Sequence, residues 1–236
     1  MKRIIVIVSI SSLCFGIAGC ASTAINEQPM YGGLEKSKEI QKADQEFIDW
    51  AVKEFGTREK ASKDAADRGW QSYHNNDLST AMKRFNQAWL LDSSNAQAYW
   101  GFGIIVGIRA AENHPEENLN ESIKFLQMAY DKDPANARIM ADLAHSHTKK
   151  GYFLKWKHKI GDEDEFSKAQ LIFANAAKIA PADPTINGLW SILYFYKEDY
   201  IRAKEKLDTA IAAGYKPEPL YVKDLNKKLK NLSGAK

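Results

Sequence analysis

Cysteine is almost absent from this chain, which has only Cys14 and Cys20. Both lie near the N-terminus, so no internal disulfide can form in the rest of the chain, which suits an oxidising compartment because no thiol remains there to mispair. Charge of one sign is lacking too: the net charge is +3 and falls to about +1 without Lys2 and Arg3, so no global field recruits nucleic acid. Proline is scarce, with seven residues, while 44% of the residues are hydrophobic. This composition favours a helical globular protein with an adequate core.

The chain has one long hydrophobic run, Ile4–Ile17. At about 14 residues the run is short for a membrane-spanning helix, which needs roughly 20, and with the basic residues before it the pattern is that of a secretory signal over residues 1–20. The run ends in Ile-Ala-Gly-Cys, which resembles the lipobox of bacterial lipoproteins. That resemblance implies lipidation of Cys20 and, with Ala21 next to it, the periplasmic face of the outer membrane. The alternative is a plain secretory signal in which Cys20 is incidental.

A unit of two short amphipathic helices, Gly69–Asn95, recurs along the chain. Its second helix has Ala81, Phe85 and Ala88 on one stripe, at the spacing of a helix that buries one face. Successive equivalents of these three positions are separated by 41, 47 and 34 residues, so the period is 34, with seven and thirteen residues inserted in the second and third copies. Such a pair needs a copy of itself to stack on. The equivalents of Ala81 are Ser122, Ala169 and Ala203.

This pattern resembles the tetratricopeptide repeat (TPR), which has a small residue at position 8, Ala at 20, a large apolar residue at 24 and Pro at 32. The chain departs from the family in lacking Trp at position 4 throughout and the closing proline in the first and fourth copies. The resemblance implies an all-α, TPR-type α-solenoid of about four units in a domain over residues 57–218. The expected units are 62–95, 96–136, 137–183 and 184–217.

Both flanks of the repeats carry their own patterns. Residues 21–34 are small, polar and turn-forming and predict a flexible tether. An apolar stripe predicts an N-terminal capping helix over 35–56, and a second stripe with a lysine-rich outer face predicts a C-terminal capping helix and tail over 219–236. The two insertions are expected near 111–118, as a longer turn, and near 151–165.

In TPR proteins the first helices line a concave groove through positions 2, 5, 9, 12 and 13, where a peptide commonly lies. Carried over by register, these positions are mostly aromatic and aliphatic, while Arg138 and Lys149 are suited to fix a carboxylate. The alternative is that a terminal helix fills the groove and these residues are core. The expected groove residues are Trp70, Tyr73, His74, Trp100, Ile104, Ile108, Arg138, His145, Lys149, Ile192, Phe195 and Tyr196.

The segment 149–159, KKGYFLKWKHK, interleaves lysines with aromatic residues. It either docks on anionic headgroups, an acidic partner or a glycan, or it extends a helix by two turns that bury Phe153, Leu154 or Trp156 while the lysines stay solvated. The residues of this secondary surface are Lys155, Trp156, Lys157 and Lys159.

No pattern typical of catalysis, of a metal site or of a cofactor site is present. His145 and His147 are two residues apart on a helix and so point to different sides. The glycines near residue 103 lack the dinucleotide spacing, and the acidic stretch 162–165, which lacks the pattern of a calcium loop, is better explained as a solvated turn and helix N-terminus. The sequence therefore predicts a non-enzymatic protein without metal or cofactor.

Two functions are compatible with these features. The first is a lipid-anchored periplasmic scaffold that binds a segment of another envelope protein in the groove. It would be similar to the TPR lipoproteins that assist pilus secretin assembly, insertion of outer-membrane proteins or control of wall hydrolases. The second is a peptidoglycan- or glycan-binding module that stacks sugars on Trp70 and Trp100.

Overall fold

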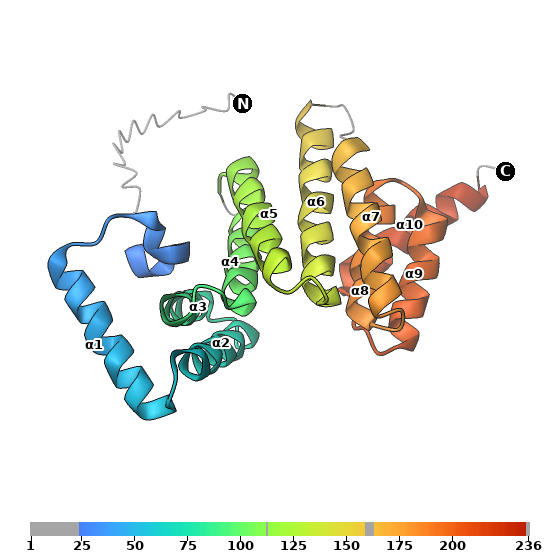
Figure 1. The fold of residues 1–236 in the computed structure, drawn as a ribbon. Coiled ribbons are helices and arrows are strands. Elements are labelled where there is room, and N and C mark those ends of the chain that lie inside the picture. The colour runs from blue at the N-terminus through green and yellow to red at the C-terminus, as the bar shows by residue number, and fades with distance from the viewer. Residues whose placement is uncertain (1–23, 112, 159–162, 235–236) are drawn as a thin grey trace, which may run out of the picture.

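The protein is all-α in the computed structural model, which describes residues 24–111, 113–158 and 163–234. In these ranges the chain forms α-helices and two short 3-10 helices and contains no strand (Figure 1), which confirms the expected fold class. The 3-10 helices are η1 (Ile25–Glu27) and η2 (Pro29–Gly33). The α-helices are α1 (Lys38–Phe55), α2 (Arg58–His74), α3 (Leu78–Leu91), α4 (Ala96–Arg109), α5 (Pro115–Lys132), α6 (Ala137–His158), α7 (Glu163–Ile179), α8 (Pro184–Tyr196), α9 (Tyr200–Ala212) and α10 (Pro219–Gly234).

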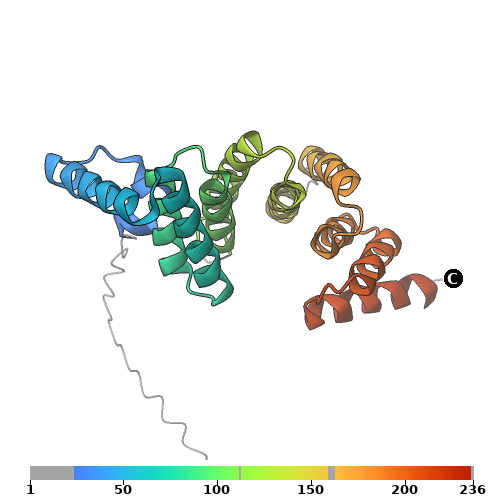
Figure 2. The ribbon, with the colours of Figure 1, turned by 60° about the horizontal axis from the view of Figure 1, so that its bottom comes forward.

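Sequential helices pair into hairpins, and the hairpins stack. Within the described ranges the pairs are α2–α3, α4–α5, α6–α7 and α8–α9, and each packs on the next. The stack curves into an arc, which Figure 2 shows from another side. At its ends α1 packs against α2, and α10 packs against α9. The arrangement is a TPR-type solenoid with one additional helix at each end.

The same turn joins the two helices of the first and fourth hairpins. Asn76 and Glu198 have left-handed φ angles of 60° and 62°. Each is followed by an aspartate, Asp77 or Asp199, whose side chain accepts a hydrogen bond from the backbone N–H three residues on, at 3.0 and 3.1 Å. These aspartates cap the first turn of the second helix. The common geometry shows that the two hairpins are structurally equivalent.

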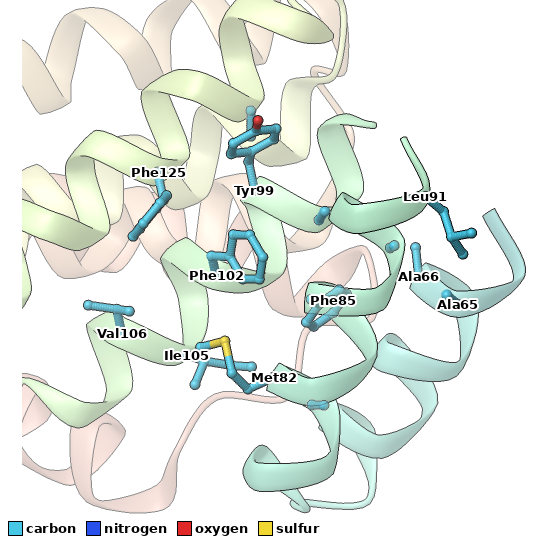
Figure 3. Packing of buried hydrophobic residues seen from close by; sticks show 14 of the residues in the cluster. Ala65, Ala66, Met82, Phe85, Leu91, Tyr99, Phe102, Ile105, Val106 and Phe125 are labelled. Atoms are coloured by element: carbon cyan, nitrogen blue, oxygen red, sulfur yellow. The ribbon is translucent and has the colours of Figure 1, made fainter. Parts of the chain in front are cut away.

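Large and small residues alternate where the helices cross. Phe85 of α3 is fully buried and fills the space beside Gly69 of α2 and Gly101 of α4. A Cβ atom at these glycines would lie 2.7 and 2.3 Å from the Phe85 side chain, so a larger residue would force the helices apart. Figure 3 shows Phe85 in the cluster that also holds Met82 and Phe102. The repeated small residues of the second helices are buried in every hairpin: Ala81, Ser122, Ala169 and Ala203.

The two insertions lengthen helices more than they lengthen turns. In the second hairpin only residues 110–114 connect the helices, and α5 has 18 residues against 14 in α3. Pro115 begins α5, as its fixed φ angle allows at a first helical position. In the third hairpin α6 has 22 residues against 14 in α4. Of the turn expected over 111–118, residues 115–118 therefore belong to α5, while the connection 110–114 is longer than the connection 75–77 of the first hairpin.

Residues 24–33 lie against α3, where the sequence had led us to expect a free tether. Asn86, a buried side chain of α3, donates from Nδ2 to the carbonyl oxygens of Asn26 and Gln28 at 2.9 and 2.8 Å. Its Oδ1 accepts from the backbone N–H of Tyr31 at 3.4 Å. The tether prediction is wrong for these residues, because their composition does not reveal the polar partner on α3. We call residues 24–33 the N-terminal strap.

Candidate binding groove

The first helices of successive hairpins contact one another, α2 with α4, α4 with α6, and α6 with α8. They form the inner layer of the curve (Figure 2). Of the expected groove residues, His74 and Arg138 are exposed and the others are half-buried, so each retains accessible surface. The half-buried set is Trp70, Tyr73, Trp100, Ile104, Ile108, His145, Lys149, Ile192, Phe195 and Tyr196.

The first two hairpins contribute an aromatic wall. Trp70 and Trp100 meet edge to face, with ring centroids 4.7 Å apart and an interplanar angle of 63°, and Tyr73 packs edge-on against Trp70 at 5.7 Å. The indole N–H of Trp70 donates to Oε1 of Gln97 at 2.8 Å. The two indoles are therefore fixed by each other and by their hydrogen bonds, and they are not the free stacking platforms that the glycan hypothesis assumed.

A carboxylate absent from the expected groove set lies beside this wall. Asp142 of α6 accepts a hydrogen bond from Nε1 of Trp100 at 2.8 Å. Burial raises the pKa of Asp142 to about 6, against the lowering effects of the Trp100 N–H, Lys149 and Arg138. Asp142 occupies position 6 of its repeat, which the family register does not assign to the groove. The signal that could have revealed it is the indole N–H of Trp100, because a half-buried indole usually needs an acceptor.

His145 and Lys149 follow Asp142 on α6. The Nδ1 atom of His145 is buried and has no hydrogen-bond partner among the described residues. Burial lowers the pKa of His145 to about 3, helped by the positive charge of Lys149, so the imidazole is neutral near pH 7. Burial also lowers the pKa of Lys149, against the opposing effect of Asp142. We call Asp142, His145 and Lys149 the central cluster; it gives an otherwise apolar groove a polar middle.

Arg138 has a different role from the one expected. Its Nε donates to Oδ2 of Asp183 at 3.0 Å, an ion pair between the third and fourth hairpins. This pair, with backbone hydrogen bonds from the start of α8, lowers the pKa of Asp183 against the effect of burial. Arg138 therefore supports the stacking of the hairpins, and its guanidinium is already paired with a carboxylate.

The groove is partly closed at the fourth hairpin. Tyr221 of α10 packs edge-on against Phe195 at 5.4 Å, and its hydroxyl group hydrogen-bonds the hydroxyl of Ser191. Tyr196 stacks on Tyr152 of the lengthened α6 at 4.1 Å. A cavity of about 240 Å³ remains between α8 and α10. The C-terminal helix thus covers one end of the groove and leaves the part between α2 and α6 accessible.

The 149–157 part of the insertion is helical, as the second of our two interpretations predicts. Phe153 and Leu154 are half-buried, but Trp156 is 72% exposed. Lys155 pairs with Glu198 at 2.8 Å and Lys157 with Glu116 at 2.5 Å, so these lysines join α6 to the α8–α9 turn and to α5. The fourth residue of the expected secondary surface, Lys159, lies outside the described residues.

The sequence predicts a solvated start of α7, but Glu165 in this stretch is buried. One of its oxygens lies 2.5 Å from Nδ1 of His147 and the other 2.9 Å from Nζ of Lys150. These partners lower the pKa of Glu165, although burial acts in the opposite direction. His147 therefore stabilises the α6–α7 hairpin, on a different side of α6 from His145.

The described part of the chain holds no group of three or more histidine, cysteine, aspartate or glutamate residues placed to bind a metal ion. In the same residues, none of the helices combines the length and the apolarity that crossing a bilayer requires. The expected lipidation site, Cys20, and the hydrophobic run before it lie outside the described residues.

Comparison with known proteins adds little to these observations. No protein-family model matches the chain, and no curated protein matches it. Among solved structures the chain is similar to one described as "Functional Characterization of Pseudomonas Aeruginosa pilF". The identity is 13%, the match covers 68% of this chain and 79% of that chain, and the TM-score is 0.33. A likeness this distant carries no weight for function, so the assignment of a TPR-type helical-repeat fold rests on the helices of this chain itself.

Proposed function

We propose that the protein is a non-catalytic scaffold that holds an extended segment or a helix of another envelope protein in its concave groove. The observation that supports this most is the strip of half-buried side chains along α2, α4 and α6, each of which keeps accessible surface in the described chain. Aromatic and aliphatic side chains held in fixed positions provide contact area with little loss of conformational entropy on binding. The central cluster would set the register of the bound segment.

We also propose that Cys20 is lipidated and anchors the protein to the periplasmic face of the outer membrane. The support for this is the sequence pattern around Cys20. The docked strap adds a geometric consequence, because α3 holds the chain at Asn26 and Gln28. The six steps from Cys20 to Asn26 span about 22 Å at most. The anchor would therefore hold the folded part close to the bilayer.

The glycan-binding alternative has less support. Sugar rings stack on the open face of an aromatic side chain, whereas Trp70 and Trp100 are packed against each other and both donate their indole N–H groups within the protein. We therefore treat binding to peptidoglycan as the competing outcome of the experiment that tests the scaffold.

The test is affinity capture from envelope extracts with Trp100→Ala. We expect wild-type protein to retain specific envelope proteins, and Trp100→Ala to retain at least about tenfold less of them, because a central aromatic anchor carries much of the energy of such an interface. Leu171→Asn is the control, because Leu171 lies on α7 and is 64% exposed. It should capture the same proteins as wild type. Ile104→Asn provides a second groove variant in case Trp100→Ala reduces folding, which thermal unfolding checks.

Two results would contradict the proposal. Equal capture by wild type and both groove variants would exclude the groove as the binding surface. Sedimentation with purified sacculi that Trp100→Ala weakens, without any retained protein, would favour the glycan alternative. Cell fractionation of Cys20→Ser tests the anchor separately, since we expect this variant to leave the membrane fraction.

A further inference from the structure

The cavity between α8 and α10 has a composition that differs from the rest of the groove. Its volume is about 240 Å³, and its walls combine four aromatic rings with two carboxylates. The rings are Phe195 and Tyr196 near the end of α8, Tyr215 in the connection that follows α9, and Tyr221 of α10. The carboxylates are those of Glu218 and Asp224.

Three of the aromatic rings are fixed by contacts with one another or with residues outside the cavity. Tyr196 has one face stacked on Tyr152, and the Tyr221 hydroxyl is bonded to Ser191. Phe195 lies between these two rings and meets each of them edge to face, at 5.8 and 5.4 Å. Such rings need little reorganisation to receive a ligand, because their positions are already determined.

The two carboxylates have no cationic partner in the described residues. Neither Glu218 nor Asp224 makes an ion pair or accepts a hydrogen bond at its side chain there, and both residues are exposed. Lys227 and Lys228 lie on the same helix, but they line the neighbouring hollow on the far side of Asp224. Lys228 is placed over the ring of Tyr200, with 5.6 Å from its Nζ to the ring centroid. No ion pair within the described part of the chain therefore neutralises the two carboxylates at the cavity.

We propose that this cavity binds the cationic side chain, lysine or arginine, of the protein segment that lies in the groove. An alkylammonium or alkylguanidinium group is attracted to the faces of aromatic rings and pairs with a carboxylate beside them. The rings and the carboxylates of the cavity therefore both favour such a side chain. The volume of about 240 Å³ is enough for one long side chain. This inference rests on the proposed function for the source of the cation, while the chemistry of the cavity is independent of it.

The cavity also gives the groove a direction. The half-buried ammonium of Lys149 at the centre repels a second cation, whereas the unpaired carboxylates at the α10 end attract one. A bound segment with its basic residue at the α8–α10 end and neutral or acidic residues over α4 and α6 satisfies both. A segment in the reverse direction satisfies neither.

The test uses two small probes of equal shape, butylguanidinium and its uncharged isostere butylurea. Each is titrated into the purified protein, and binding is followed by NMR through the labelled methyl group of Ile192, which lines the cavity. Ile192→Val assigns the signal. We expect the cation to bind at millimolar concentrations and at least about fivefold more tightly than butylurea, from its interaction with rings and carboxylates.

A charge-removing variant separates the contribution of the carboxylates from that of the aromatic rings. In the double variant Glu218→Gln with Asp224→Asn we expect affinity for butylguanidinium to fall about fivefold while that for butylurea stays the same. The matched control is Glu205→Gln, an exposed carboxylate of α9 that does not line the cavity. It should bind both probes as wild type does. Both altered residues are exposed, so the double variant should fold, which its thermal unfolding verifies.

Equal binding of the two probes, or unchanged butylguanidinium affinity in the double variant, would overturn the proposal. Failure of the groove as a protein-binding surface would leave both probe measurements unaffected, so the two hypotheses fail separately.

Discussion

Replacing Phe85 with alanine lowers the free energy of unfolding by about 3–5 kcal/mol. The side chain is fully buried between two hairpins, where Gly69 and Gly101 approach its ring so closely that neither has room for a Cβ atom. Backbone atoms of two helices therefore surround the deleted ring and cannot close on the space it leaves. Urea unfolding followed by far-UV circular dichroism measures the loss.

The control for this prediction is Leu171→Ala on the outer side of α7. Leu171 is 64% exposed, and its truncation should change stability by less than about 0.5 kcal/mol. A loss below about 1 kcal/mol in Phe85→Ala would mean that the first and second hairpins do not share the core described here.

The central cluster has two groups whose effects on stability oppose each other as the pH falls. The pKa of His145 drops to about 3 in the folded chain, so the unfolded chain takes up the proton first and stability is lost from pH 6.5 downward. The pKa of Asp142 rises to about 6, so the folded chain takes up the proton first and stability is gained from pH 6 down to 3.8. Between pH 8 and pH 5 these effects amount to a loss of about 2 kcal/mol and a gain of about 1.4 kcal/mol.

Single substitutions should reveal the two effects. Asp142→Asn keeps the acceptor for Trp100 and removes the buried charge, so it should be more stable than wild type at pH 8. Its advantage should shrink by about 1.4 kcal/mol at pH 5. His145→Leu should gain about 2 kcal/mol on wild type over the same interval. Urea unfolding of the three proteins at both pH values checks this, since groups common to all three cancel. Parallel pH profiles would show that neither group titrates in the folded chain as described.

The repeat period predicts most of the fold because its constraints are local and recur. Ala81, Phe85 and their equivalents mark the buried stripe of each second helix, and a helix pair with such a stripe can only be satisfied by a stacked neighbour. Gly56 ends α1 with a φ angle of 86°, and Thr57 caps α2, as residues of these types do. The first insertion was only partly predicted, because a turn-like residue such as Pro115 also begins helices.

The site was only partly predictable from the sequence. The family register identifies groove positions, but it says nothing about contacts between distant elements. The strap depends on Asn86, which looks like an ordinary helix residue until its partners 58 and 60 residues away are known. The cavity between α8 and α10 depends on Tyr221, whose position is set by its contacts with Phe195 and Ser191 of α8. Asp142 occupies position 6 of its repeat, next to groove position 5, and only its contact with Trp100 reveals its role.

Photo-crosslinking in living cells tests the central claim most directly, with a photoreactive amino acid placed at position 104 or 196 in the groove and at position 171 or 201 on the outer helices. Leu171 and Ile201 are well exposed and serve as matched controls. The account predicts that positions 104 and 196 capture the same envelope protein, identified by mass spectrometry, and that the outer positions do not. Capture from positions 171 and 201 without capture from the groove would contradict it.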